Sequence, residues 1–232
     1  SAAFGSSGQR CMALSVVMVE KKIKKLFLDD LITKVKNLKV GFQKLESNSY
    51  GPLVSDDHLN NVQNYIKLAK DEGGEIILDG REINDRRNSD KKGYFLGPTV
   101  IDSVKPNMKS YLNEIFGPVL QIIEIDNIEE GIQIINQNSF GNGCCIFTEN
   151  GNYAREFSEK VDIGMVGVNI PLPVPSSFHS FGGWKNSLFG DLNIYGPDGL
   201  RFYTRRKTIT QRWFGSNDLS EINLSMPSNQ KN

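Results

Sequence analysis

The sequence predicts an α/β fold organised around a mostly parallel sheet. Two observations predict it: short runs of β-forming residues alternate with segments of helical periodicity, and 38% of the 232 residues are hydrophobic, enough for a buried core. The strands and helices of this alternation are expected at 75–78, 99–104, 118–125, 128–135, 144–148, 153–161 and 165–169. Strands joined through helices form βα units, in which neighbouring strands run parallel.

Two helices are predicted ahead of these strands. Apolar residues recur at steps of three and four between Ile23 and Leu38, which places them on one face of a helix. Ser55, followed by two aspartates, is a favourable start for the second helix, because serine caps a first turn and acidic residues favour the positive end of the helix dipole. Gly73 and Gly74 end this helix. In the same way, Asn127 is expected to cap the helix after the third strand.

The remaining segments are predicted from polar, proline or alternating residues. Residues 79–93 are dense in charge and predict a solvated loop, to which we assign no function. Prolines within 171–175 break regular structure ahead of the glycine-containing run 181–185. The alternation over Leu200–Trp213 predicts a strand that needs a neighbour in its own chain or in another subunit. From Ser216 onward we expect a frayed tail.

Charge and composition exclude several classes of partner. The chain carries 27 basic and 27 acidic residues, so nucleic acid and anionic membrane surfaces are not expected partners. The longest apolar stretch, 12–19, is too short to span a membrane. Three cysteines and two histidines match no metal-ligand spacing, so no metal is expected, and the cysteine usage suits a reducing compartment. The start at Ser1 shows no targeting segment, and we expect that the chain begins within a longer protein.

Cys11 is the strongest candidate for chemistry. It directly follows a Gly/Ser loop and precedes a run that is compatible with a helix. Backbone N–H groups and the positive end of a helix lower the pKa of a thiol and stabilise an oxyanion on the carbonyl that it attacks. The alternative is the commoner role of a cysteine, a small buried hydrophobic side chain.

Three motifs carry a resemblance to a known family. Residues 4–15 read Phe-Gly-Ser-Ser-Gly-Gln-Arg-Cys-Met-Ala-Leu-Ser and resemble the nucleophile motif of the aldehyde dehydrogenase superfamily. Residues 114–119, Glu-Ile-Phe-Gly-Pro-Val, and 181–187, Phe-Gly-Gly-Trp-Lys-Asn-Ser, resemble two further signatures in the same order. The resemblance implies the catalytic domain of the aldehyde dehydrogenase fold over residues 1–195. It also implies an oligomerisation strand and tail over residues 196–232.

Further segments resemble one branch of this family, the CoA-acylating methylmalonate-semialdehyde dehydrogenases. They are residues 9–15, 141–143, 166–175, 189–191, 203–204 and 207–210. Leu188 and Asp191 depart from the superfamily's usual Gly-x-Gly-Arg-Glu run as this branch does. The resemblance implies that Cys11 attacks the aldehyde, that a hydride passes to NAD and that a thioester remains. It further implies loss of carbon dioxide from methylmalonate or malonate semialdehyde and transfer to coenzyme A, giving propionyl-CoA or acetyl-CoA, a reaction of valine catabolism.

Four other residues receive roles, three of them from the resemblance and Arg10 from its place beside Cys11. Glu114 matches the carboxylate that accepts hydrogen bonds from the nicotinamide ribose, and Phe116 matches the aromatic residue beside it. Without the resemblance they would be a surface carboxylate and a core aromatic residue. We hypothesise that Arg10 binds the substrate carboxylate, its alternative being a solvated or structural arginine. Phe181 is expected to line the substrate tunnel, although a packed aromatic residue explains it equally.

The other cysteines and the two histidines receive no catalytic role. Cys144 and Cys145 are expected on opposite sides of a strand as packing residues. His58 is expected to face solvent from the first turn of its helix, and His179 is left unassigned.

The resemblance also leaves alternatives open. Relatives carry most of their NAD-binding domain before the nucleophile motif, and we expect that domain to be absent from these residues, so that the chain alone does not turn over. The alternatives are a hydrolytic aldehyde dehydrogenase that does not need CoA and a non-catalytic oligomerisation fragment. A homo-oligomer, dimer or tetramer, is expected. The family implies a mitochondrial protein in a eukaryote and a cytoplasmic one otherwise.

Overall fold

A four-stranded sheet forms the centre of the protein. The computed structural model describes residues 1–42, 48–83, 93–211 and 213. The strand order is β1-β4-β3-β2, with β1 (Val16–Glu20), β4 (Val119–Ile125) and β3 (Thr99–Asp102) parallel and β2 (Glu75–Leu78) antiparallel to β3. This sheet confirms the expected fold class, and its last three strands in sequence lie where periodicity predicted them.

Helices cover both faces of this sheet. On β4, Leu120 and Ile122 pack with residues of α1 (Lys21–Lys36). Val119 and Ile123, which point to the other face, pack with residues of α2 (Asp56–Asp71) and α5 (Ile128–Gln137). A strand that is buried on both faces needs apolar residues at successive positions, which explains the continuous run in β4.

The predicted helix caps are confirmed. The Ser55 hydroxyl accepts a hydrogen bond from the backbone N–H of His58 at 3.1 Å. The Asn127 side chain accepts one from the backbone N–H of Glu130 at 2.9 Å. Each cap satisfies an N–H group that has no partner within its own helix, and this fixes where α2 and α5 begin.

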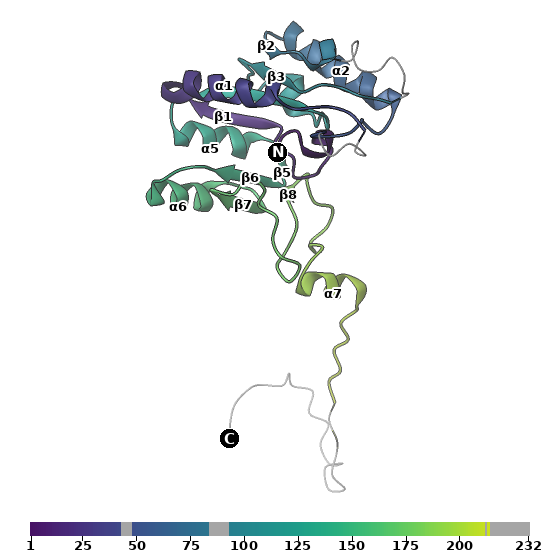
Figure 1. Ribbon diagram of the computed structural model, residues 1–232. Coiled ribbons are helices and arrows are strands. Elements are labelled where there is room, and N and C mark those ends of the chain that lie inside the picture. The colour runs from purple at the N-terminus through teal and green to yellow at the C-terminus, as the bar shows by residue number, and fades with distance from the viewer. Residues whose placement is uncertain (43–47, 84–92, 212, 214–232) are drawn as a thin grey trace.

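A smaller unit packs on the far side of α5. Strands β6 (Gly143–Ile146) and β7 (Met165–Val168) pair in parallel, and α6 (Gly151–Lys160) shares an apolar cluster with them and with α5. Figure 1 shows α5 between this pair and the four-stranded sheet. Strands β5 (Phe140–Gly141) and β8 (Trp184–Lys185) form a separate antiparallel pair, which brings the 181–185 run beside the start of β6.

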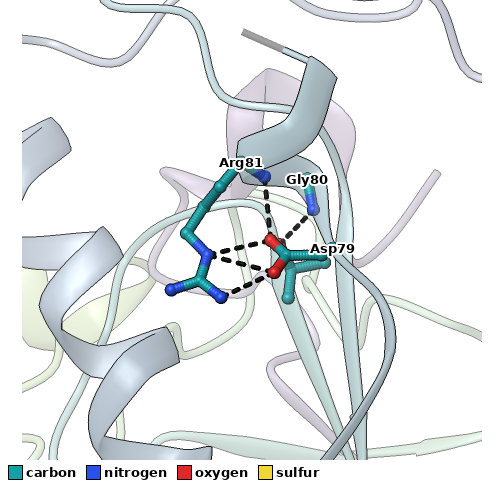
Figure 2. A network of polar contacts seen from close by, with 4 residues as sticks. Asp79, Gly80 and Arg81 are labelled. Atoms are coloured by element: carbon teal, nitrogen blue, oxygen red, sulfur yellow. Dashed lines mark hydrogen bonds and ion pairs between the residues drawn. The ribbon is translucent and has the colours of Figure 1, made fainter.

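The polar segment that begins at Asp79 is more ordered at its start than a solvated loop. Residues Gly80–Ile83 form a 3-10 turn, η2, and the backbone N–H of Gly80 donates to the Thr99 hydroxyl at 3.0 Å. Figure 2 shows the hydrogen bonds between the Arg81 guanidinium and the Asp79 carboxylate. Arg81 Nη2 lies 2.6 Å from Asp79 Oδ2. This hydrogen bond holds the pKa of Asp79 below its usual value. The rest of the expected loop, 84–92, lies outside the described residues.

The expected strand over Leu200–Trp213 is wrong at its start. Residues Pro197–Tyr203 form helix α7, because Pro197 occupies its first turn and Asp198 favours its positive end. Residues 204–211 follow without strand pairing, and Figure 1 shows α7 set apart from the sheets. The expected tail from Ser216 lies outside the described residues. No helix among the described residues is long and apolar enough to cross a membrane.

Candidate active site

The segment that precedes Cys11 is a left-handed turn. Residues Gly5–Gly8 form η1, in which Ser6, Ser7 and Gly8 have φ values of +55°, +58° and +68°. A residue other than glycine costs about 1 to 2 kcal/mol in this region, so other contacts must hold the turn. One of them is the hydroxyl of Ser7, which is buried and donates to the carbonyl of Gly51 at 2.6 Å.

Cys11 lies on the surface in the next turn. The backbone N–H of Ala13 donates to the carbonyl of Arg10 at 3.0 Å, which places Cys11 at a corner of the chain, and its side chain is exposed and free of any disulfide. We call residues 5–13 the nucleophile turn, after the role that the sequence predicts for Cys11. An exposed thiol on a turn can react with a small molecule. This exposure rules out the alternative that Cys11 is a buried packing residue.

The run after Cys11, although compatible with a helix, does not form one. The chain enters β1 at Val16 instead. Val16, Val17 and Val19 are β-branched residues, which favour strands, and β4 offers a parallel partner along the whole of β1. The positive end of a helix therefore does not face the thiol through this segment.

The second motif packs directly against the nucleophile turn. A Cβ atom placed on Gly8 would lie 2.1 Å from the carbonyl oxygen of Gly117, so only glycine allows the two backbones to approach this closely. The Gln9 amide attaches the nucleophile turn to a different segment, the one ahead of α2, because its Oε1 accepts from the backbone N–H of Val54 at 3.1 Å. Motifs far apart in sequence thus share one backbone contact.

Glu114 and Phe116 lie in the turn 113–118, between α4 (Lys109–Leu112) and β4. Both are exposed, and the Phe116 side chain, 37% accessible, sits on backbone with φ of +56°. His58 holds this turn through a 2.8 Å hydrogen bond between its Nε2 and the carbonyl oxygen of Phe116. The expectation that His58 faces solvent is therefore wrong, because its ring is half-buried against the turn. Its place in sequence shows only a polar residue in a first helical turn, which does not indicate this contact.

The third motif reaches the nucleophile turn through Asn142. The side-chain Nδ2 of Asn142 donates to the carbonyl of Cys11 at 2.9 Å. A Cβ atom on Gly183 would lie 2.9 Å from the Cα of Asn142, so the 181–185 run packs on the backbone of this residue. Asn142 was not identified by sequence reasoning as a separate candidate.

Two predicted binding residues have weaker structural support. The Arg10 side chain is exposed, with Nη1 3.3 Å from the place that a Cβ on Gly5 would occupy. Its neighbourhood to Cys11 is compatible with either a binding or a solvated arginine. The Phe181 ring is half-buried and packs at 5.5 Å between centroids on Tyr195, which agrees with the alternative of a packed aromatic residue.

Lys185 in the third motif has a structural role that the sequence did not indicate. Its Nζ donates to the carbonyls of Ile135, Asn136 and Asn138, at 3.3, 3.0 and 3.1 Å. These carbonyls end α5, where a cation is favourable for the helix dipole. Lys185 therefore ties the motif to α5.

The two other cysteines are poor nucleophiles. Cys144 packs in the cluster of α5, α6 and β7, and burial raises the pKa of its thiol to about 12. Burial also raises the pKa of Cys145. These findings agree with the expected packing role. No group of three or more possible metal ligands is present in the part of the chain that the structure describes.

All three motifs gather at one edge of the sheets. Cys11 and Gly117 precede the parallel strands β1 and β4, and Asn142 precedes β6. The arrangement presents an exposed thiol, an exposed carboxylate and an exposed ring around one pair of packed turns. Such a site can attack a carbonyl carbon and bind a polar cofactor beside it.

The fold and this site define the class of the protein. The model of the aldehyde dehydrogenase family matches residues 1–209, and the chain belongs to that family. It is 48% identical over 215 residues to malonate-semialdehyde dehydrogenase of Pseudomonas aeruginosa, a match that covers 91% of this chain and 42% of the relative. It is 46% identical over 212 residues to the Bacillus cereus enzyme of the same name, covering 91% and 43%.

Solved structures agree. The crystal structure of methylmalonate-semialdehyde dehydrogenase from Oceanimonas doudoroffii has a TM-score of 0.88 and 47% identity, covering 93% of this chain and 44% of that one. A candidate methylmalonate-semialdehyde dehydrogenase from Sinorhizobium meliloti, complexed with NAD, has a TM-score of 0.88 and 40% identity, covering 93% and 44%. The expected resemblance to this branch is confirmed. The chain spans less than half the length of these relatives.

Proposed function

We propose that the protein containing this chain oxidises malonate or methylmalonate semialdehyde with NAD and passes the acyl group to coenzyme A. One observation carries the proposal: three separate motifs meet at the turn that exposes Cys11. Gly8 packs on Gly117, and Asn142 links the Cys11 carbonyl to Gly183. The names of the similar proteins support the substrate class.

In the first step the thiolate of Cys11 attacks the aldehyde carbon. A C–S bond forms, and one electron pair of the C=O bond moves to oxygen. When that pair returns to re-form the carbonyl, the hydrogen on the carbon leaves with its bonding electrons, and a thioester remains on Cys11. Bound NAD supplies the acceptor for this hydride.

The residues of the 113–118 turn fit a dinucleotide. The Glu114 carboxylate is exposed and is a hydrogen-bond acceptor for the hydroxyl groups of a ribose, and the exposed Phe116 ring offers an apolar surface beside it. His58 holds the turn through the Phe116 carbonyl. We assign the ribose contact to Glu114 and the neighbouring packing contact to Phe116.

The substrate carboxylate is assigned to Arg10. A guanidinium offers two parallel N–H donors to a carboxylate, and Arg10 is adjacent in sequence to the nucleophile.

The thioester carbonyl lies β to this carboxylate, so loss of carbon dioxide leaves an electron pair that the carbonyl takes up, and a proton then restores the α carbon. The thiolate of coenzyme A attacks the thioester, forms acyl-CoA and releases the Cys11 thiolate. Phe181 remains a proposed tunnel residue.

The test is NADH formation by the complete gene product given methylmalonate semialdehyde, with and without coenzyme A. The Cys11→Ala variant and the Cys145→Ala variant are the matched pair. We expect a CoA-stimulated rate that Cys11→Ala abolishes and Cys145→Ala retains. Acid formation at a CoA-indifferent rate would instead support a hydrolytic aldehyde dehydrogenase, and the absence of any rate would reject the proposal.

We also propose that the C-terminal segment, residues 196–211, contacts a second copy of the chain. Its apolar side chains are exposed, Leu200 at 75%, Phe202 at 67% and Ile209 at 66%, which is unfavourable in water unless another surface covers them. Light scattering of the complete gene product should give the mass of a dimer or tetramer, and Leu200→Asp with Phe202→Asp should reduce it. A monomer before substitution would contradict this proposal.

A further inference from the structure

Asn142 joins the nucleophile turn to the smaller unit through its side chain. It lies between β5 and β6, and its Nδ2 is 2.9 Å from the carbonyl oxygen of Cys11 and 3.1 Å from the sulfur of Met12. Met12 is buried, 7% accessible, and its methyl group would lie 2.5 Å from a Cβ on Gly143. Met12, the residue after Cys11, is therefore buried in contact with the Asn142 side chain.

The backbone of Asn142 is itself fixed from two sides. Its carbonyl accepts a hydrogen bond from the backbone N–H of Met165, in β7, at 3.2 Å. Gly183 packs so closely that a Cβ atom on Gly183 would lie 2.9 Å from the Cα of Asn142. The amide therefore projects from a rigid support, as a group that orients another residue requires.

This contact acts on the conformation of Cys11. A peptide unit is planar, so holding the Cys11 carbonyl fixes the plane between Cys11 and Met12 and with it the ψ angle of Cys11. The bond from Ala13 to the Arg10 carbonyl restrains the other side of the turn. Together they limit the directions in which the exposed thiol can point.

We propose that Asn142 is a positioning residue for the nucleophile, with its amide donor orienting the Cys11 thiol towards the aldehyde carbon. The inference rests on the proposed function of Cys11. The Asn142 side chain donates to the Cys11 carbonyl and to the Met12 sulfur, and not to the 113–118 turn, so its loss should slow the chemical step without weakening NAD binding.

The experiment compares Asn142→Leu and Asn142→Asp with Asn136→Leu in the complete gene product. Both changes at Asn142 keep its approximate size and remove the donor. Asn136 is the matched control, because its Nδ2 also donates to a backbone carbonyl, that of Lys160 at 2.7 Å, between α5 and α6. For each variant, kcat, the KM for NAD and the melting temperature are measured.

We expect kcat to fall about five- to tenfold in both Asn142 variants, the loss of one hydrogen bond in the oriented state, with the KM for NAD unchanged. Asn136→Leu should keep its kcat even if its melting temperature falls. An unchanged kcat in the Asn142 variants, or an equal loss in Asn136→Leu, overturns the inference. If Asn142→Leu does not fold, Asn142→Asp decides alone. Activity retained by Cys11→Ala would reject the proposed function itself, whereas an inactive Cys11→Ala beside fully active Asn142 variants would reject only this inference.

Discussion

Gly8 and Gly117 touch through their backbones, and a Cβ on Gly8 would lie 2.1 Å from the Gly117 carbonyl oxygen. This contact joins the turn that carries Cys11 to the turn that carries Glu114 and Phe116. The spacing between the proposed nucleophile and the proposed cofactor-binding carboxylate therefore depends on two residues that have no side chain. A site built in this way depends on backbone geometry as much as on its reactive groups.

Gly8→Ala should therefore damage both stability and activity. Alanine at a φ of +68° costs about 1 to 2 kcal/mol, and displacement of the Gly117 carbonyl adds to that cost. Gly73→Ala is the control, because Gly73 has a φ of +104° with no atom within 4 Å of the added Cβ. Urea unfolding and NADH formation measure the two effects. Equal losses in the two variants would show that the contact with Gly117 has no importance.

His58→Leu should weaken NAD binding. Its ring holds the Phe116 carbonyl at 2.8 Å, and without that bond the strained turn can relax and carry Glu114 out of place. We expect the KM for NAD to rise about fivefold, in line with the loss of one hydrogen bond. His179→Leu, which removes a ring packed beside Phe178, is the control and should keep the KM. A KM that stays constant in both variants contradicts the role given to His58.

Lys185→Met should lower stability through α5. It removes a charged donor from three carbonyls at the end of this helix, for an expected loss of about 2 to 3 kcal/mol. Lys160→Met removes a lysine that pairs with Glu156 on the surface of α6, where solvent screening leaves such a pair little effect on stability. Thermal unfolding of both variants gives the comparison. Similar melting temperatures would mean that the Lys185 contacts contribute little.

Cys144 predicts a loss of stability in alkaline solution. Burial raises its pKa in the folded protein to about 12, above the value of about 8.5 for a free cysteine. The unfolded chain therefore loses this proton first as pH rises, and the stability that the protonated thiol contributes is complete below about pH 8.5 and declines up to about pH 12. Cys144→Ala should unfold with a shallower dependence on pH over this range, as measured by urea titrations. An identical slope would exclude this contribution.

The sequence predicted the layers of this fold better than its contacts. The caps at Ser55 and Asn127 follow from local chemistry, and the structure confirms both. The short apolar run after Cys11 fits a strand or a buried helix equally well, and only its pairing with β4 decides between them. At the C-terminal end, alternating threonines suggested a strand, whereas the Pro197 start produced a helix.

At the candidate site too, the sequence identifies residues but not the contacts between them. The motifs identified Cys11, Glu114 and Phe116, and the structure places these residues on two packed turns. The contributions of His58 and Asn142 depend on hydrogen bonds to carbonyls distant in sequence, and no local pattern of residue types encodes such a bond.

The opposite edge of the central sheet, where the parallel strands end, carries ion pairs instead of the motifs. There the Lys24 ammonium lies 2.9 Å from Asp102 and 3.2 Å from Glu124, and thus clamps α1 onto the ends of β3 and β4. None of the three motifs reaches that edge, because the first two lie at the starts of β1 and β4 and the third packs on Asn142, ahead of β6. A peptide, a label or a second domain could therefore be inserted into the connections that follow these strands. Such an insertion would change the stability of the fold, whereas the reacting groups would keep their arrangement.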